Sequence, residues 1–449
     1  MTNILCWFID VLSLAVTLSI FYVSIKKSTF GILLTVSMVW SIIGLFVYPI
    51  FDLLGLIDLN IEGRSFIETN GNPGILSAIH ILFISVGMWC GYFFKGKYNN
   101  KGILERFSIP LDNINPLTIW RVTTIFSLLI IIFFYYLTGF ETAIKSAAAA
   151  RSGEFDGFEG TEQFMFLKTF STISSISTAI FPIALLKKDR LFIFFYIILI
   201  ALMYLNSISR SLVLSSIVIP ITIYVRLSKI SFKTTLAFIS LIPIFYILLL
   251  YGKPFGQFIS AYLNGKDYEL IAQDNESGFL NAMLVGTGYQ WYSVQAGINN
   301  FFNTGSPLFP NDVFLSIFFG MIPSHVLESL GYGDLYYGNA NVRLACVNTE
   351  IFGLFGCTVP PTSFGYSSYL LPGAGGFILG FIMLRTYATI EHMWLIRQHR
   401  DVTKVWIPMM WFTFLSAMFS MIPTMIPRME VSIIWVFFIT YILSIKFRR

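Results

Sequence analysis

The chain has 449 residues, of which 56% are hydrophobic and only 12% charged, and its 46 phenylalanines are more than a soluble core of this length could absorb. With a mean hydropathy of +0.73, these values exclude an ordinary soluble domain and make lipid the main solvent. Apolar runs in hydrocarbon must be helical, because every backbone polar group there needs an internal partner. We therefore expect an all-α polytopic integral membrane protein.

Eleven apolar runs predict transmembrane helices in chain order. The first has no basic region before it and no small-residue cleavage site, so we expect a permanent span rather than a signal peptide. The spans divide the chain into a transmembrane bundle over 1–251 (spans 1–8), a large outer loop with short helices over 252–365, and a second bundle over 366–449 (spans 9–11). The predicted spans are 4–25, 30–51, 74–94, 117–138, 162–186, 191–206, 211–225, 234–251, 366–386, 405–426 and 431–445.

The distribution of charge predicts the orientation of these spans. With the amino terminus outside, 20 of the 29 basic residues but only five of the 24 acidic residues fall on the cytoplasmic side. The cytoplasmic side then carries a charge of +15 and the outer side −10, as the positive-inside rule requires. We expect the carboxyl terminus, which ends in KFRR, to be cytoplasmic.

Most of the polar mass lies in three outer segments, at about 52–73, 139–160 and 252–365. The third has short apolar stretches such as VFLSIFFGMIP, which are typical of amphipathic or re-entrant helices. It also holds Cys346 and Cys357, which form either a disulfide or two buried thiols. The chain shows no internal repeat and no matching pair of interrupted spans, which weakens a transporter interpretation.

Four outer arginines are candidate ligands for an anion. Arg210 in NSISRS and Arg428 in IPRMEV each lie in a tight turn between two apolar runs, while Arg151 follows KSAAAA and Arg343 lies in GNANVR. Charge at such positions is costly and favours a functional role. The alternative is that they anchor the helices at the lipid headgroups or pair with outer acids. A guanidinium fork matches phosphate oxygens, so these residues favour capture of a phosphate group.

Few other residues suggest chemistry. His325, in GMIPSHVLESLG, could serve as a general base, although a solvated loop histidine is the alternative. His80, in the third predicted span, is interpreted as a hydrogen-bonded structural residue. The acidic segments 267–269 and 274–276 have carboxylate spacing that could hold a divalent cation, but a solvated acidic loop is the default and we predict no metal site.

This combination of topology and local patterns resembles the Wzy family of O-antigen and oligosaccharide repeat-unit polymerases. The resemblance is carried by RSGEF, NSISRS, FGMIP followed by GNANVR, TVPPTSFGYSSYLLPGAGGFILG and IPRMEV. It implies a glycosyltransferase that moves a growing glycan from its lipid pyrophosphate carrier onto an incoming lipid-linked repeat unit. It further implies that Arg151, Arg210, Arg343 and Arg428 contact the pyrophosphate of the substrate.

The same resemblance implies the surroundings of the reaction. The acceptor hydroxyl needs a base, for which His325, Glu350 or another outer carboxylate could serve, and neither a metal nor another cofactor is expected. The expected location is the bacterial inner membrane, with the amino terminus periplasmic. The expected partners are the undecaprenyl-pyrophosphate-linked oligosaccharide, membrane lipids and a chain-length regulator of the Wzz type, with no nucleic acid.

Two alternatives stay open. An O-antigen ligase uses the same donor with a lipid A acceptor, and physical reasoning from this chain does not separate it from a polymerase. A lipid-linked oligosaccharide flippase would show charged or polar residues through the depth of the membrane. The polar residues of this chain are concentrated on the outer side, which favours an enzyme that acts on that side of the membrane over a flippase.

Overall fold

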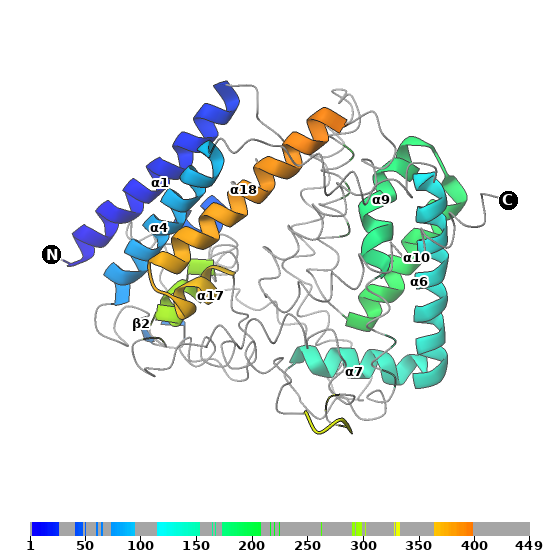
Figure 1. Ribbon diagram of the computed structural model, residues 1–449. Coiled ribbons are helices and arrows are strands. Elements are labelled where there is room, and N and C mark those ends of the chain that lie inside the picture. The colour runs from blue at the N-terminus through cyan, green and yellow to red at the C-terminus, as the bar shows by residue number, and fades with distance from the viewer. Residues whose placement is uncertain are drawn as a thin grey trace. The chain divides into compact units, whose positions relative to one another are not determined.

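The computed structural model is helical almost throughout the part of the chain that it describes (Figure 1). The described elements form two compact units. One contains α1, α4, α17 and α18, and the other contains α6, α7, α9 and α10. The described residues are 2–26, 41–47, 50, 60–61, 64–65, 73–94, 115–152, 164, 167, 173–207, 216, 220, 224, 262, 290–291, 293–298, 301, 327, 329–332 and 363–397.

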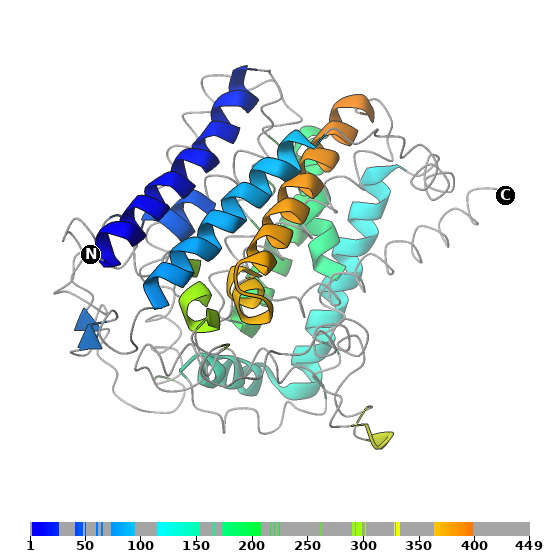
Figure 2. The same cartoon turned by 60° about the vertical axis from the view of Figure 1, so that its left-hand side comes forward.

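The first unit is built around α1 (Thr2–Lys26) and α4 (Pro73–Phe93), which pack side by side (Figures 1 and 2). A hydroxyl pair joins them, with Oγ1 of Thr17 3.1 Å from Oγ of Ser85. The unit also contains a short π-helix, η1 (Ile43–Val47), and an antiparallel pair of two-residue strands, β1 (Asn60–Ile61) and β2 (Arg64–Ser65), in which Asn60 is opposite Ser65. Residues 290–291 and 293–298 are helical as well.

Helix α18 (Ala374–Arg397) packs against α4 so closely that their backbones nearly touch. Gly87 and Gly91 of α4 and Gly376 and Gly380 of α18 lie at this contact, and a Cβ on any of them would collide with main-chain atoms of the other helix. A Cβ on Gly376, for example, would fall 2.8 Å from the carbonyl oxygen of His80. Small residues of this kind allow helices to associate in a membrane through van der Waals packing.

The contacts along α4 and α18 also fix their direction. The first turns of α18 face His80, near the start of α4, whereas Arg385 further along α18 donates a hydrogen bond to the carbonyl oxygen of Phe94. The guanidinium of Arg385 also lies over the Phe94 ring, 5.4 Å from its centroid. The two helices therefore run parallel, as predicted for the third and ninth spans.

The ninth predicted span, 366–386, is not one continuous helix. The short helix α17 (Ser363–Leu370) ends before Pro372, and α18 begins at Ala374. Gly373 between them has φ of +77°, a conformation that glycine adopts without steric cost, and Pro372 cannot donate a backbone hydrogen bond. The predicted border between the loop and this span, at 365/366, falls inside α17, and the predicted division into domains stays a prediction.

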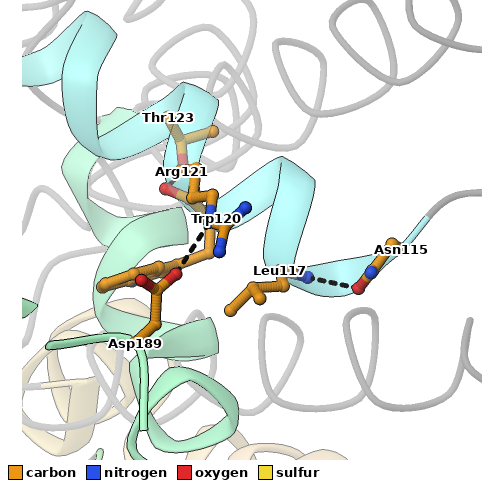
Figure 3. A network of polar contacts seen from close by, with 6 residues as sticks. All are labelled: Asn115, Leu117, Trp120, Arg121, Thr123 and Asp189. Carbon is orange, nitrogen blue, oxygen red and sulfur yellow. Dashed lines mark hydrogen bonds and ion pairs between the residues drawn. The ribbon is translucent and has the colours of Figure 1, made fainter. Parts of the chain in front are cut away.

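The second unit packs α6 (Pro116–Thr138), α9 (Ser174–Leu186) and α10 (Arg190–Ser207) against one another. Asn115 caps α6, because its Oδ1 accepts a hydrogen bond of 3.0 Å from the backbone N–H of Leu117 (Figure 3). Pro116 then occupies the first helical position, where its missing N–H costs nothing. The sequence at this point therefore specifies where the helix begins.

One end of this unit is held by an ion pair between Arg121 and Asp189, shown in Figure 3, and by an aromatic cluster around Trp120. Nε of Arg121 lies 2.7 Å from Oδ2 of Asp189, in the turn between α9 and α10. Trp120 is fully buried, and its ring centroid lies 6.3 Å from those of Phe181, Phe192 and Tyr196. Both ends of this contact were predicted to be cytoplasmic, so the ion pair agrees with the predicted hairpin.

Three described helices are long and apolar enough to cross a membrane: Ile4–Val23, Ile75–Phe93 and Pro116–Thr138. Shorter apolar helices cover Ile176–Leu186, Arg190–Asn206 and Ala374–Thr386. The helical class is thereby confirmed over the described ranges, and α1, α4, α6 and α10 match their predicted spans within two residues at each end. The total of eleven spans stays a prediction.

Candidate functional site

Of the predicted site residues, only Arg151 lies in the described part of the chain. It belongs to the last turn of α7 (Phe140–Ser152), the helix that follows α6. The structure therefore does not test whether the predicted residues share a cavity. Those outside the described residues are Arg210, Arg343, Arg428, His325 and Glu350, together with Cys346 and Cys357.

Helix α7 leaves α6 at a sharp turn and lies across its end (Figures 1 and 2). Gly139 makes the turn possible with φ of +79°. Ala143, Ile144 and Ala147 are buried, whereas Glu141 is exposed and forms an ion pair of 2.8 Å with Lys145. The hydrogen bond from Lys145 lowers the pKa of the Glu141 carboxyl below its ordinary value. Arg151 lies in the last turn of this helix, at the end away from α6.

The end of α10 carries a second polar feature of this unit. Asn206 is buried, and its Oδ1 has no hydrogen-bond partner within the described ranges. It lies four positions before Arg210 in the sequence. A buried carboxamide oxygen without a donor is unfavourable by about 1–3 kcal/mol, so this position favours a donor that the described residues do not supply.

In the first unit, a hydrogen-bonded chain crosses the break between α17 and α18. The N–H of Gly373 donates to Nδ1 of His80 over 2.9 Å, so the hydrogen of the neutral ring must be on Nε2. Nε2 then donates to Oγ of Ser367 over 2.9 Å, and Ser367 donates to the carbonyl oxygen of Phe364 over 2.7 Å. The predicted structural role of His80 is confirmed, because its two ring nitrogens hold the break in place.

A second polar group of the first unit centres on Gln290. Its side chain has no exposed surface and packs on Gly44 in η1, where any Cβ would collide with the carboxamide. Neither Oε1 nor Nε2 has a hydrogen-bond partner among the described residues. Gln295 is 5% exposed, and its Oε1 is also unpartnered there. Three polar atoms of these two buried carboxamides thus have no hydrogen-bond partner in the part of the chain that the structure describes.

The segment that carries the two glutamines is held tightly against α17. Oγ of Ser368 donates to the carbonyl oxygen of Val294 at 2.9 Å. Gly297 and Gly365 have no room for a Cβ, because each faces the opposite segment at contact distance. The glutamines therefore lie on a rigid support that is connected through α17 to His80.

Asp10 in α1 is a third buried polar residue of the first unit. It is 8% exposed, and its Oδ1 has no partner within the part that the structure describes. Thr17, which contacts α4, follows it two helical turns later on the same face of α1. An acid within an apolar span is a candidate functional residue by default.

The two units thus offer different chemistry. The first supplies neutral hydrogen-bonding groups and one buried carboxyl, whereas the second carries Arg151 at the end of an amphipathic helix. Among the described residues, no group of three or more histidine, cysteine, aspartate or glutamate side chains is arranged to hold a metal ion.

Sequence reasoning had singled out neither Asp10 nor the two glutamines. Asp10 interrupts the first apolar run, and an ionisable residue inside a span is a readable signal. Gln290 and Gln295 lie in GYQWYSVQAG, where composition gives no sign of burial. The glycine contacts of α4 and α18 also have a readable signal, because GMWCG and GFILG both fit the G-x-x-x-G pattern.

The chain matches no protein-family model, no curated protein and no solved structure.

Proposed function

We propose that this chain is a membrane glycosyltransferase that polymerises undecaprenyl-pyrophosphate-linked oligosaccharide repeat units at the periplasmic face of a bacterial inner membrane. The observation that carries the proposal is the distribution of charge. The outer side is acidic overall, with 19 acidic and nine basic residues, and arginines stand there at two tight turns, Arg210 and Arg428. Such isolated guanidinium groups suit the capture of a single diphosphate.

The proposal includes eleven spans with the amino terminus outside. Two observations on the fold support the relative directions that this topology assigns to the spans. Helices α4 and α18 run parallel, as the third and ninth spans should. Helices α6 and α10 also run parallel, since the hydroxyl of Tyr135 donates to the carbonyl oxygen of Leu202 and Arg121 pairs with Asp189 at the opposite end.

The proposed reaction is a substitution at the anomeric carbon of the donor glycan. A hydroxyl of the incoming repeat unit forms the new glycosidic bond, and the bond from the anomeric carbon to the pyrophosphate oxygen breaks. The electron pair leaves with the pyrophosphate, where guanidinium groups stabilise the developing charge by about 1.5–3 kcal/mol for each charge-assisted contact. The acceptor proton passes to a base, for which His325 and Glu350 are the candidates.

The most informative experiment deletes the gene in its native bacterium and displays the surface glycan on a gel. Loss of a polymerase leaves single repeat units attached to their acceptor. Long polymer that stays unattached would instead indicate a ligase, and complete absence of exported glycan would indicate a flippase. Either of these two results would replace the proposal.

Arginine variants test the site itself. Arg210→Lys and Arg428→Lys keep the positive charge but remove the bidentate fork, so both should strongly shorten the polymer at unchanged protein levels. Arg448→Lys, in the predicted cytoplasmic tail, is the matched control and should leave polymer length unchanged. Full-length polymer in both outer variants would contradict a role of these arginines.

The topology has its own test. A reporter protein fused after Arg449 should be active only if it is a type that works in the cytoplasm. Activity of a periplasm-specific reporter at this position would reverse the orientation and put the four arginines on the wrong side.

A further inference from the structure

The carboxamide of Gln290 has a position that packing alone does not explain. It is fully buried, yet neither its oxygen nor its nitrogen has a hydrogen-bond partner among the described residues. Buried polar groups in native proteins are nearly always paired, and an exception often marks a place where a ligand, ion or water belongs. An apolar side chain of similar size would fill the same space without the loss of hydrogen bonds. Gln290 therefore carries a cost that a purely structural residue would not.

The element opposite Gln290 is unusual as well. Gly44 lies in η1, a five-residue π-helix, and the absence of a side chain there leaves room for the carboxamide. Single turns of π-helix occur often at functional sites, since the extra residue changes the direction of neighbouring groups. An unpartnered, fully buried carboxamide and a π-helix thus lie in direct contact in the first unit.

We propose that Gln290 recognises an uncharged hydrogen-bonding group of a glycan. This proposal rests on the function proposed above and names a residue that recognises the sugar part of the substrate. A carboxamide both donates and accepts hydrogen bonds, and so does a sugar hydroxyl or an acetamido group. A phosphate at neutral pH mainly accepts and is matched by arginine, so a neutral amide selects for the sugar.

The support around the glutamines is suitable for a recognition site. Ser368 forms a hydrogen bond with the main chain at Val294. Gly297 and Gly365 pack so closely that a Cβ on either would collide with the opposite segment. Groups held in this way lose little freedom when they bind. Because Gln290 has no exposed surface, a ligand can reach it only when the side chains that cover it move. Binding at this position is therefore coupled to a local opening of the first unit.

The test separates stability from recognition in the purified full-length protein. Gln290→Leu removes both unpartnered atoms at similar volume, so the variant should unfold at the same temperature as the native protein or a higher one. The probes are the free repeat-unit oligosaccharide, released by mild acid from the surface glycan of the native bacterium, and inorganic pyrophosphate. Each stabilises the protein in proportion to its binding. We expect the oligosaccharide to bind Gln290→Leu roughly tenfold more weakly, with the response to pyrophosphate unchanged.

Thr124→Val is the matched control, because Thr124 in α6 is also fully buried with an unpartnered hydroxyl. It should keep the native affinity for both probes. If Gln290→Leu binds the oligosaccharide like the native protein, or if it loses stability, the recognition role is wrong. If the native protein responds to pyrophosphate but not to the oligosaccharide, this inference fails while the proposed function stands. If gene deletion leaves polymer length unchanged, the proposed function itself fails.

Discussion

The helices of the two units pack against one another in different ways. In the first unit, α4 and α18 approach through facing glycines, so backbone contacts backbone. In the second, α6, α9 and α10 are held by large aromatic rings, with Phe181 and Tyr196 stacked 4.4 Å apart, and by hydroxyl pairs such as Ser177 with Thr123 at 3.0 Å. Close backbone packing leaves little space for side chains, whereas aromatic packing fills a wider gap.

The difference matters for where polar groups can be placed. In the first unit, glycine contacts hold α4 and α18 together, and a buried carboxamide such as that of Gln290 has no hydrogen-bond partner among the described residues. In the second unit many of the hydroxyls already serve the packing: Thr178, for instance, accepts a hydrogen bond from Tyr196. We therefore expect substitutions to have distinct effects in the two units.

The largest expected effect is the loss of an aromatic anchor. Trp120→Ala removes a fully buried side chain that contacts three other rings, and large-to-small changes of this kind cost about 3–5 kcal/mol. Unfolding of the purified protein in mixed detergent micelles should show this loss. Phe194→Ala in the same unit, at a side chain that is 58% exposed, should change stability far less.

A glycine substitution should break the first unit by overpacking rather than by leaving a cavity. In Gly380→Leu the new side chain would collide with the backbone of Ile84 and Met88, which we expect to cost about 3 kcal/mol. Ile382→Leu, on the exposed side of the same helix, is the control. Equal stability of Gly380→Leu and the native protein would show that the backbones do not approach as described.

Loss of the two hydrogen bonds of His80 should have an intermediate effect on stability. His80→Leu leaves the N–H of Gly373 and the hydroxyl of Ser367 without this partner, at a cost of about 2 kcal/mol. His80→Gln offers both an acceptor and a donor and should recover part of that loss. Equal stability of the two variants in the same unfolding assay would argue against the hydrogen bonds of His80 to Gly373 and Ser367.

The smallest effect belongs to the ion pair of the second unit. The side chain of Arg121 is 44% exposed, so solvent screens its interaction with Asp189 and the pair should contribute less than about 1 kcal/mol. A double-mutant cycle with Arg121→Gln and Asp189→Asn measures this coupling energy, which should shrink further in high salt. A coupling that salt does not change would indicate a buried pair instead.

The helices that span a membrane could be predicted well from the sequence. An apolar run near twenty residues has one stable conformation in hydrocarbon, so the bounds of α1, α4 and α6 follow from composition alone. The role of His80 was also predictable, because a buried imidazole in a span needs hydrogen-bond partners. Features that depend on the composition of a single segment could therefore be predicted from the sequence.

Features that depend on tertiary contacts could not be recovered in the same way. The break at Pro372 and Gly373 lies in a stretch of high hydropathy, so a sliding average passes over it even though the Pro-Gly pair is a turn signal. The burial of Gln290 depends on Gly44, which is far away in the sequence. Of the four predicted arginines, only Arg151 lies in the described ranges.

The break between α17 and α18 has a consequence for how the protein is made. At 1.5 Å per residue, the eight residues of α17 extend about 12 Å and cannot cross a bilayer, and the apolar part of α18, Ala374–Thr386, extends only about 20 Å. Neither helix therefore offers the insertion machinery a full span by itself. The place of α17 in the first unit then depends on its contacts with Val294 and His80.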